Sequence, residues 1–149
     1  MIRVQREDFD PGVELALLGA GRTDIGGVAN FVGQVRGGSD GVRAMTLEHY
    51  PGMTEKQLAA VEEEARRRWS GIEVTIIHRF GRLLPGERIV FVAVGATHRA
   101  AAFAACEFLV DWLKTRAPFW KLEERADGSD WVAAHTEDDS RAARWDKIP

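Results

Sequence analysis

The residues best suited to chemistry lie in the segment LKTRAPFWKLEE, residues 113–124, where Lys114 and Lys121 flank a proline and two aromatic side chains. Two ammonium groups that are close together and partly removed from water lower each other's pKa, so one becomes available as a proton acceptor or nucleophile. Lys114 also has a purely structural explanation, because a cation near the C-terminal end of a helix is favoured by the helix dipole. The catalytic interpretation therefore requires a fold that brings the two lysines together.

A second basic group, His98 and Arg99, stands at the start of the segment that Lys114 ends. The first turn of a helix disfavours positive charge, so an arginine there indicates a bound anion, held by free backbone N–H groups and the guanidinium. An ordinary surface arginine is the alternative explanation. The other candidate basic positions are Arg36, His78, Arg79 and Arg116.

The remaining reactive residue types give no site. Cys106 lies between Phe103 and Val110 on an apolar stripe, which indicates a buried small hydrophobe rather than a nucleophile, and a lone cysteine cannot form an internal disulfide. His49 and His135 have no metal-ligand spacing with other residues, and no GxGxxG or phosphate-loop pattern is present. We therefore expect no metal and no cofactor.

Three helices are predicted to position these residues. Residues 10–21 form the first, with Asp10 as its cap, and residues 54–69 the second, in which Thr54 and Gln57 have capping-box spacing. Residues 97–117 form the longest, because Thr97 can cap it and the residue before Pro118 avoids helical geometry. Its predicted buried stripe is Phe103, Cys106, Val110, Leu113 and Ala117.

The strands fall between and after these helices. The β-branched runs EVTIIHRF and ERIVFVAVG predict paired strands, joined by the turn-rich segment GRLLPG. GGVANFVGQVR, AMTLEHY and FWKLEE are further strand-like segments, and an amphipathic tail ends in RAARWDKIP. Hairpin-like strand pairs mixed with three main helices indicate an α+β fold with a mixed or antiparallel sheet.

Composition limits the class of protein. The 149 residues have 45% hydrophobic side chains, which suits a single domain over residues 1–149 with its own core. The formal net charge of -3 disfavours a general nucleic-acid or membrane-surface binder, so any bound anion should be small and locally held. The N-terminal segment MIRVQREDF has no signal-peptide character and no run is long enough to span a bilayer, so we expect a cytoplasmic protein.

Four ordered motifs resemble one known family. They are LEHYPGM (residues 47–53), HRFGRLLPGE (78–87), HRAAAF (98–103) and DWLKTRAPFWK (111–121), and the resemblance runs from about Val28 to Trp145. The chain is similar to the catalytic, larger subunit of molybdopterin synthase. The resemblance implies an α/β-hammerhead-like fold and a homodimer within a heterotetramer.

The reaction that the resemblance implies is a sulfur transfer. Cyclic pyranopterin monophosphate becomes molybdopterin when a dithiolene is installed, and the sulfur arrives as a thiocarboxylate at the C-terminal glycine of a small ubiquitin-like partner. The extended tail of that partner enters a pocket of the catalytic subunit. A non-catalytic docking module for such a tail is the main alternative, and a small phosphate-ester hydrolase is a weaker one.

The resemblance also implies roles for individual residues. Lys114 lies next to the incoming thiocarboxylate and the acyl intermediate, and Lys121 stabilises charge and transfers protons. At His135 the family pattern shows arginine, so His135 stays outside the expected anion site. The expected substrate-binding residues are Arg36, His98 and Arg99 for the pterin and its phosphate, with Phe31 and Met53 as pocket walls.

The length of the third helix has a consequence for this site. Arg99 and Lys114 are fifteen residues apart on one predicted helix, so at about 1.5 Å per residue their backbones are separated by roughly 22 Å. If both serve one small substrate, His98 and Arg99 should come from a neighbouring copy of the chain. A symmetric dimer would supply that copy and form two equivalent sites.

Overall fold

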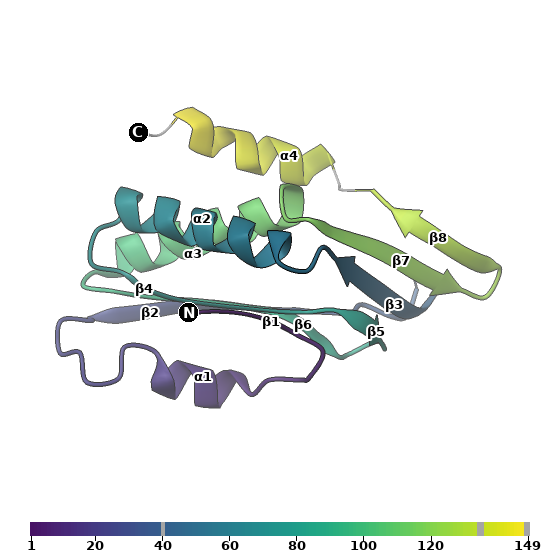
Figure 1. The fold of residues 1–149 in the computed structure, drawn as a ribbon, viewed down its shortest axis with the longest axis horizontal. Coiled ribbons are helices and arrows are strands. Elements are labelled where there is room, and N and C mark those ends of the chain that lie inside the picture. The colour runs from purple at the N-terminus through teal and green to yellow at the C-terminus, as the bar shows by residue number, and fades with distance from the viewer. Residues whose placement is uncertain (40, 134–135, 148–149) are drawn as a thin grey trace.

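The computed structural model describes residues 1–39, 41–133 and 136–147, which form two sheets and the helices that cover them (Figure 1). The strands are β1 (Ile2–Gln5), β2 (Gly27–Gln34), β3 (Val42–His49), β4 (Glu73–Arg79), β5 (Gly81–Leu83), β6 (Arg88–Ala96), β7 (Phe119–Arg125) and β8 (Gly128–Val132). The helices are α1 (Pro11–Leu17), α2 (Met53–Arg68), α3 (Arg99–Thr115), α4 (Thr136–Ala143) and the 3-10 helix η1 (Arg144–Lys147).

Sheet A has the strand order β1-β4-β6-β2, in which only the β1–β4 pair is parallel. Helix α1 lies on one face of this sheet, and α2 and α3 lie on the other (Figure 1). Because both faces are covered, β4 and β6 are buried along almost their whole length, which explains their continuous apolar sequences. These are the two strands predicted to pair, and that prediction is confirmed.

Sheet B is antiparallel, has the order β5-β3-β7-β8, and extends beyond the helices to one end of the molecule (Figure 1). In its centre β3 pairs with β7, so that His49 lies opposite Phe119 and Leu47 opposite Lys121. The predicted turn GRLLPG in fact contains β5, which pairs with β3. β1 and β5 have only four and three residues, too few for a reliable alternation of polar and apolar side chains.

The first two helices have the expected places but not all the expected ends. Asp10 caps α1 as predicted, accepting hydrogen bonds from the backbone of Gly12 at 2.8 Å and Val13 at 3.2 Å, although the helix ends at Leu17 rather than Gly21. The Thr54 cap for α2 is wrong. Gly52 is the cap residue and donates its N–H to the Glu55 carboxylate at 2.7 Å, while the buried Thr54 hydroxyl donates to the Tyr50 carbonyl at 2.9 Å.

Helix α3 differs from its prediction in cap and phase. His98 rather than Thr97 is its N-cap, and the helix ends at Thr115, three residues before Pro118. The predicted stripe is only partly right, because Cys106 is buried but Phe103 is 66% exposed. Three of the residues that α3 buries have small side chains, Ala102, Ala105 and Cys106, and these let α3 pack closely on β2 and β6.

The tail is fixed to α3 by a buried carboxylate. Asp111 accepts hydrogen bonds from the Trp145 indole N–H at 2.8 Å and from Arg144 at 3.0 Å. Arg144 and Arg141 also form ion pairs with Glu107, at 2.6 and 3.1 Å. This Asp111 latch, Asp111 with Arg144 and Trp145, holds α4 and η1 against the outer side of α3 (Figure 1).

The α+β prediction is confirmed, with α4 as a short addition to the three main helices. No helix in the described ranges has the length and apolar character needed to cross a membrane. Position 26, just before β2, requires glycine, because the backbone lies so close to Thr97 that a Cβ at Gly26 would collide with the Thr97 carbonyl oxygen. The glycine thus sets the start of β2 directly beside the start of α3.

Candidate functional site

A cavity of about 470 Å³ lies where the C-terminal end of α3 meets β7 and the ends of β2 and β4. We call it the lysine cavity, because Lys114 from α3 and Lys121 from β7 both line it. Arg36, which follows β2, and Arg125 add two further cations to its wall. The fold therefore brings the two lysines to one place, as the catalytic interpretation requires.

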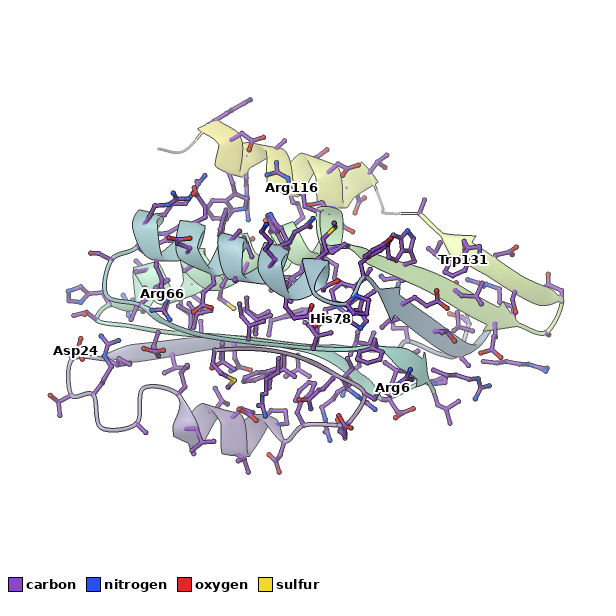
Figure 2. All side chains as sticks on the ribbon, in the orientation of Figure 1. Arg6, Asp24, Arg66, His78, Arg116 and Trp131 are labelled. Carbon is purple, nitrogen blue, oxygen red and sulfur yellow. The ribbon has the colours of Figure 1, made fainter. Side chains whose placement is uncertain are left out.

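The junction of α3 and β7 produces this arrangement. Pro118 separates the helix from a strand that begins at Phe119, so Lys114 and Lys121 come from elements joined by a very short connection. The Phe119 ring stacks on the His78 ring, with centroids 3.6 Å apart and an interplanar angle of 14°. His78 belongs to β4 and lies below the helices in the view of Figure 2, so this stack ties β7 to β4.

Lys114 has an unusual electrostatic environment. Burial lowers the pKa of its ammonium group, and the positive charges of Lys121 and Arg36 lower it further. The carboxylate of Asp138, from α4, acts in the opposite direction. Lys114 is consequently more often an uncharged amine than a solvent-exposed lysine is, which suits a proton acceptor or nucleophile.

His78 is neutral at physiological pH. Burial lowers its pKa from 6.5 to about 3, a hydrogen bond to the Arg79 carbonyl opposes that change, and the charges of Lys114, Lys121 and His49 add to it. The distance from Nδ1 to the Arg79 oxygen is 2.8 Å. Because a carbonyl oxygen only accepts, Nδ1 carries the single proton of the neutral ring and Nε2 carries a lone pair.

The cavity wall is cationic overall. Arg36, Lys114, Lys121 and Arg125 face two carboxylates, Glu123 and Asp138. Glu123 is paired with Arg125 at 2.6 Å, whereas Asp138 has no ion pair with any residue that the structure describes. A small anionic ligand fits this distribution of charge, and the volume is that of an ordinary small-molecule site.

Other predicted site residues lie elsewhere. His98 and Arg99 are exposed at the opposite end of α3 from Lys114. Phe31 lines a neighbouring cavity of about 500 Å³, which it shares with Lys114. Met53, the first residue of α2, is 50% exposed and lines neither cavity. His135 lies outside the described residues.

Several polar residues of the lysine cavity have no role in the sequence-based predictions, among them His78 and Asp138. His78 is one of the candidate basic positions, but its burial depends on Phe119, which is far along the chain. Asp138 falls in a polar tail where nothing in the pattern indicates proximity to Lys114. Arg79, the neighbour of His78, has a structural role: it donates to the backbone carbonyls of Arg6 and Arg88, at 2.9 and 3.0 Å.

Cys106 is buried, as predicted, and burial together with Glu107 raises the pKa of its thiol to about 11. It is therefore a poor nucleophile. Across the described ranges, no group of three or more His, Cys, Asp or Glu side chains is placed to hold a metal ion. The chemistry that the arrangement can support is that of amines and guanidinium groups acting on an anion.

The comparison with known proteins decides the family. The family model described as MoaE protein matches residues 4–116. The chain belongs to the MoaE family. Two relatives named molybdopterin synthase catalytic subunit are similar over nearly the whole chain. The one from Ralstonia nicotianae is 55% identical over 97% of this chain and 83% of the relative, and the one from Pseudomonas aeruginosa is 53% identical over 98% and 99%.

The MoaE fold is seen directly in a solved relative. The structure of the molybdopterin biosynthesis MoaE protein from Burkholderia ambifaria matches with a TM-score of 0.85 and 56% identity, and covers 98% of this chain and 97% of that one. The two sheets and their helices are therefore the family architecture. The lysine cavity is part of this MoaE fold.

Proposed function

We propose that the chain is the catalytic subunit of a molybdopterin synthase, which transfers sulfur from the C-terminal thiocarboxylate of a small ubiquitin-like partner to cyclic pyranopterin monophosphate. The names of the relatives support this function and favour an enzyme over a docking module. The observation that carries the proposal is the meeting of Lys114 and Lys121 in one cationic cavity. A cytoplasmic location and the absence of a resident cofactor stay predictions.

The charge of the cavity suits both reactants, since the thiocarboxylate and the precursor's phosphate are anions. In each transfer a carbon–sulfur bond forms to the precursor while a carbon–oxygen bond of the precursor breaks, and the carbon–sulfur bond of the thiocarboxylate breaks afterwards. The displaced oxygen stays on the phosphate when the cyclic ester opens in one transfer, and leaves as water in the other. Water takes up the acyl group, so the partner leaves as a carboxylate and the sulfur stays on the precursor. Two such transfers supply both sulfurs of the dithiolene.

Each cationic residue has a proposed part in this reaction. Lys114 lies beside the acyl carbon, where its buried amine can stabilise the developing oxyanion or hold the acyl group. Lys121, across the cavity, stabilises charge and transfers protons. Arg36 binds the phosphate through its guanidinium.

Reconstitution tests this assignment. The full chain, a thiocarboxylated partner and the precursor are mixed, and dithiolene product is measured. Lys114→Ala and Lys121→Ala should each lose nearly all product while remaining folded, whereas Lys56→Ala, at an exposed position on α2, is the matched control and should stay active. Near-normal turnover in either cavity variant would remove that lysine from the mechanism.

Two further measurements separate the enzyme from its alternatives. Cys106→Ala should keep most activity, because all sulfur comes from the partner. A partner lacking its last two residues should dock weakly and support no reaction, because its tail is proposed to enter the cavity as an extended chain. Absence of product from the wild-type mixture, with the partner still bound, would favour the non-catalytic docking module.

We further propose that His98 and Arg99 serve the lysine cavity of a second copy of the chain. Along α3, Arg99 and Lys114 are separated by roughly 22 Å, too far for both to contact one small substrate within a single copy. Two large apolar side chains are exposed on the elements that begin beside each other at Arg99, Phe103 on α3 at 66% and Val28 on β2 at 46%. Exposed apolar side chains that lie close together are typical of a surface that a partner covers.

Mixing two inactive variants tests the shared site. Arg99→Ala and Lys114→Ala chains are unfolded and refolded together. With random pairing about half of the dimers are mixed, and in each of these one site receives intact Lys114 from one chain and intact Arg99 from the other, so about a quarter of all sites should recover. Mixed dimers that form and remain inactive would exclude the shared site.

A further inference from the structure

The ring of His78 is held rigidly at the wall of the lysine cavity. Its Nδ1–H donates to the Arg79 carbonyl at 2.8 Å, and one face stacks on Phe119. Two restraints on one small side chain fix both its position and its rotation. A group held in this way is already organised for binding before a ligand arrives.

The other ring nitrogen, Nε2, forms no hydrogen bond with any residue that the structure describes. Nε2 also keeps some contact with solvent. In the described ranges the fully buried side-chain nitrogen and oxygen atoms without a hydrogen bond are Arg3 Nε, Glu14 Oε2 and His49 Nδ1. His78 is only 7% exposed and lines the lysine cavity, so this cavity is where a ligand can approach its ring.

The surrounding charges keep Nε2 an acceptor. Protonation would place a third cation beside Lys114 and Lys121 in a buried site, and the ring stays neutral until about pH 3. Charged ammonium and guanidinium groups donate hydrogen bonds but do not accept them, so the cations on this wall hold the anionic part of a ligand. An open lone pair at a fixed place among these donors is suited to an N–H or O–H group.

We propose that His78 is a substrate-binding residue whose Nε2 accepts a hydrogen bond from an N–H or O–H group on the uncharged part of the precursor. The cations of the cavity bind the anionic part, and His78 selects for a donor at a second point. This inference rests on the proposed function for the identity of the precursor. The tautomer of His78 and the opening of Nε2 are properties of the protein itself.

The first test uses the wild-type chain and does not require a measurement of turnover. The full chain is labelled with ¹⁵N-histidine, and the His78 ring nitrogens are followed by NMR from about pH 5 to 8, the range in which an ordinary histidine titrates. We expect a neutral ring with the proton on Nδ1 throughout. Protonation in this range, or a proton on Nε2, would overturn the inference.

Two amide variants test the acceptor itself. His78→Asn places an amide near Nδ1, so it can still donate to the Arg79 carbonyl but presents nothing at the position of Nε2. His78→Gln places its amide near Nε2 and restores an acceptor oxygen there. We expect the dissociation constant of the precursor to rise about tenfold in His78→Asn, the effect of one hydrogen bond, and to return most of the way in His78→Gln.

Sulfate, an anion without a donor group at neutral pH, is the control ligand. Its affinity should be equal in the wild type and both His78 variants, and should fall in Arg36→Ala. If the precursor binds His78→Asn and the wild type with equal affinity, the inference is overturned, whatever the rate of turnover. If the variants differ as expected but the wild type makes no dithiolene with the thiocarboxylated partner, the proposed sulfur transfer fails and the His78 contact stands.

Discussion

Replacing His78 with phenylalanine should make the protein less sensitive to mild acid. In the folded chain burial lowers the pKa of His78 from 6.5 to about 3. Between these two pH values the unfolded chain binds a proton at this position and the folded chain does not, so the free energy of unfolding falls as the pH falls. At 1.36 kcal/mol per pH unit, the loss caused by His78 between pH 7 and pH 5 is about 2 kcal/mol.

The phenylalanine side chain can keep the stack on Phe119 but cannot titrate. The variant should therefore lose about 2 kcal/mol less than the wild type between pH 7 and pH 5. It should also be less stable at pH 7, by about 1 kcal/mol, because the Arg79 carbonyl loses its donor. The slope with pH, rather than the stability at one pH, is thus the quantity to compare.

Urea unfolding followed by tryptophan fluorescence gives both quantities. His98→Gln, a histidine replacement at an exposed position, is the matched control and should follow the wild-type slope. If the wild type and His78→Phe lose equal stability between pH 7 and pH 5, then His78 is not held neutral by burial. The electrostatic description of the cavity wall would then be wrong.

Three further predictions concern the cavity, the tail and the start of α3. The pH dependence of Lys114 acylation, measured by mass spectrometry, should shift to higher pH in Lys121→Ala, because a charge that lowers the Lys114 pKa is removed. It should shift to lower pH in Asp138→Asn, because a charge that raises the Lys114 pKa is removed. Unchanged profiles in both variants would show that these two charges do not act on Lys114. Asp111→Asn should cost about 1–3 kcal/mol in unfolding free energy and speed hydrogen exchange in α4, since a buried acceptor of Arg144 and Trp145 is weakened; unchanged exchange would contradict the latch. Gly26→Ala should lower the free energy of unfolding by about 1–3 kcal/mol, because its methyl group collides with the Thr97 carbonyl; an equally stable variant would show that this approach is not tight.

The sequence predicts most of the central elements because their signals are local. The β-branched runs of β4 and β6 and the Asp10 cap of α1 appear where expected. Which residues of α3 face the core is harder to predict, because alanines fill much of its sequence and its faces therefore differ little in hydrophobicity. Phe103 has the size of a core residue, yet it is 66% exposed, and α3 packs on the sheet through other residues, Ala102, Ala105, Cys106 and Leu109.

The candidate site is predictable where it depends on neighbours in the chain. Lys114 and Lys121 line one cavity because only residues 116–118 separate the end of α3 from the start of β7. The position of His78 depends instead on the Phe119 stack, and that of Asp138 on the Asp111 latch, contacts between residues far apart in sequence. No local pattern in the sequence encodes these contacts.

The pairing of β3 with β7 has a consequence for synthesis on the ribosome. All strands of sheet A have been made by Ala96, but β3, made by His49, must wait for Phe119–Arg125 to cover one of its edges. In the meantime its only neighbour is the three-residue β5. A nascent chain stalled before Phe119 would thus expose a long open strand edge, the feature most prone to pairing with other chains. Chaperone demand should peak while this portion of the chain is being translated.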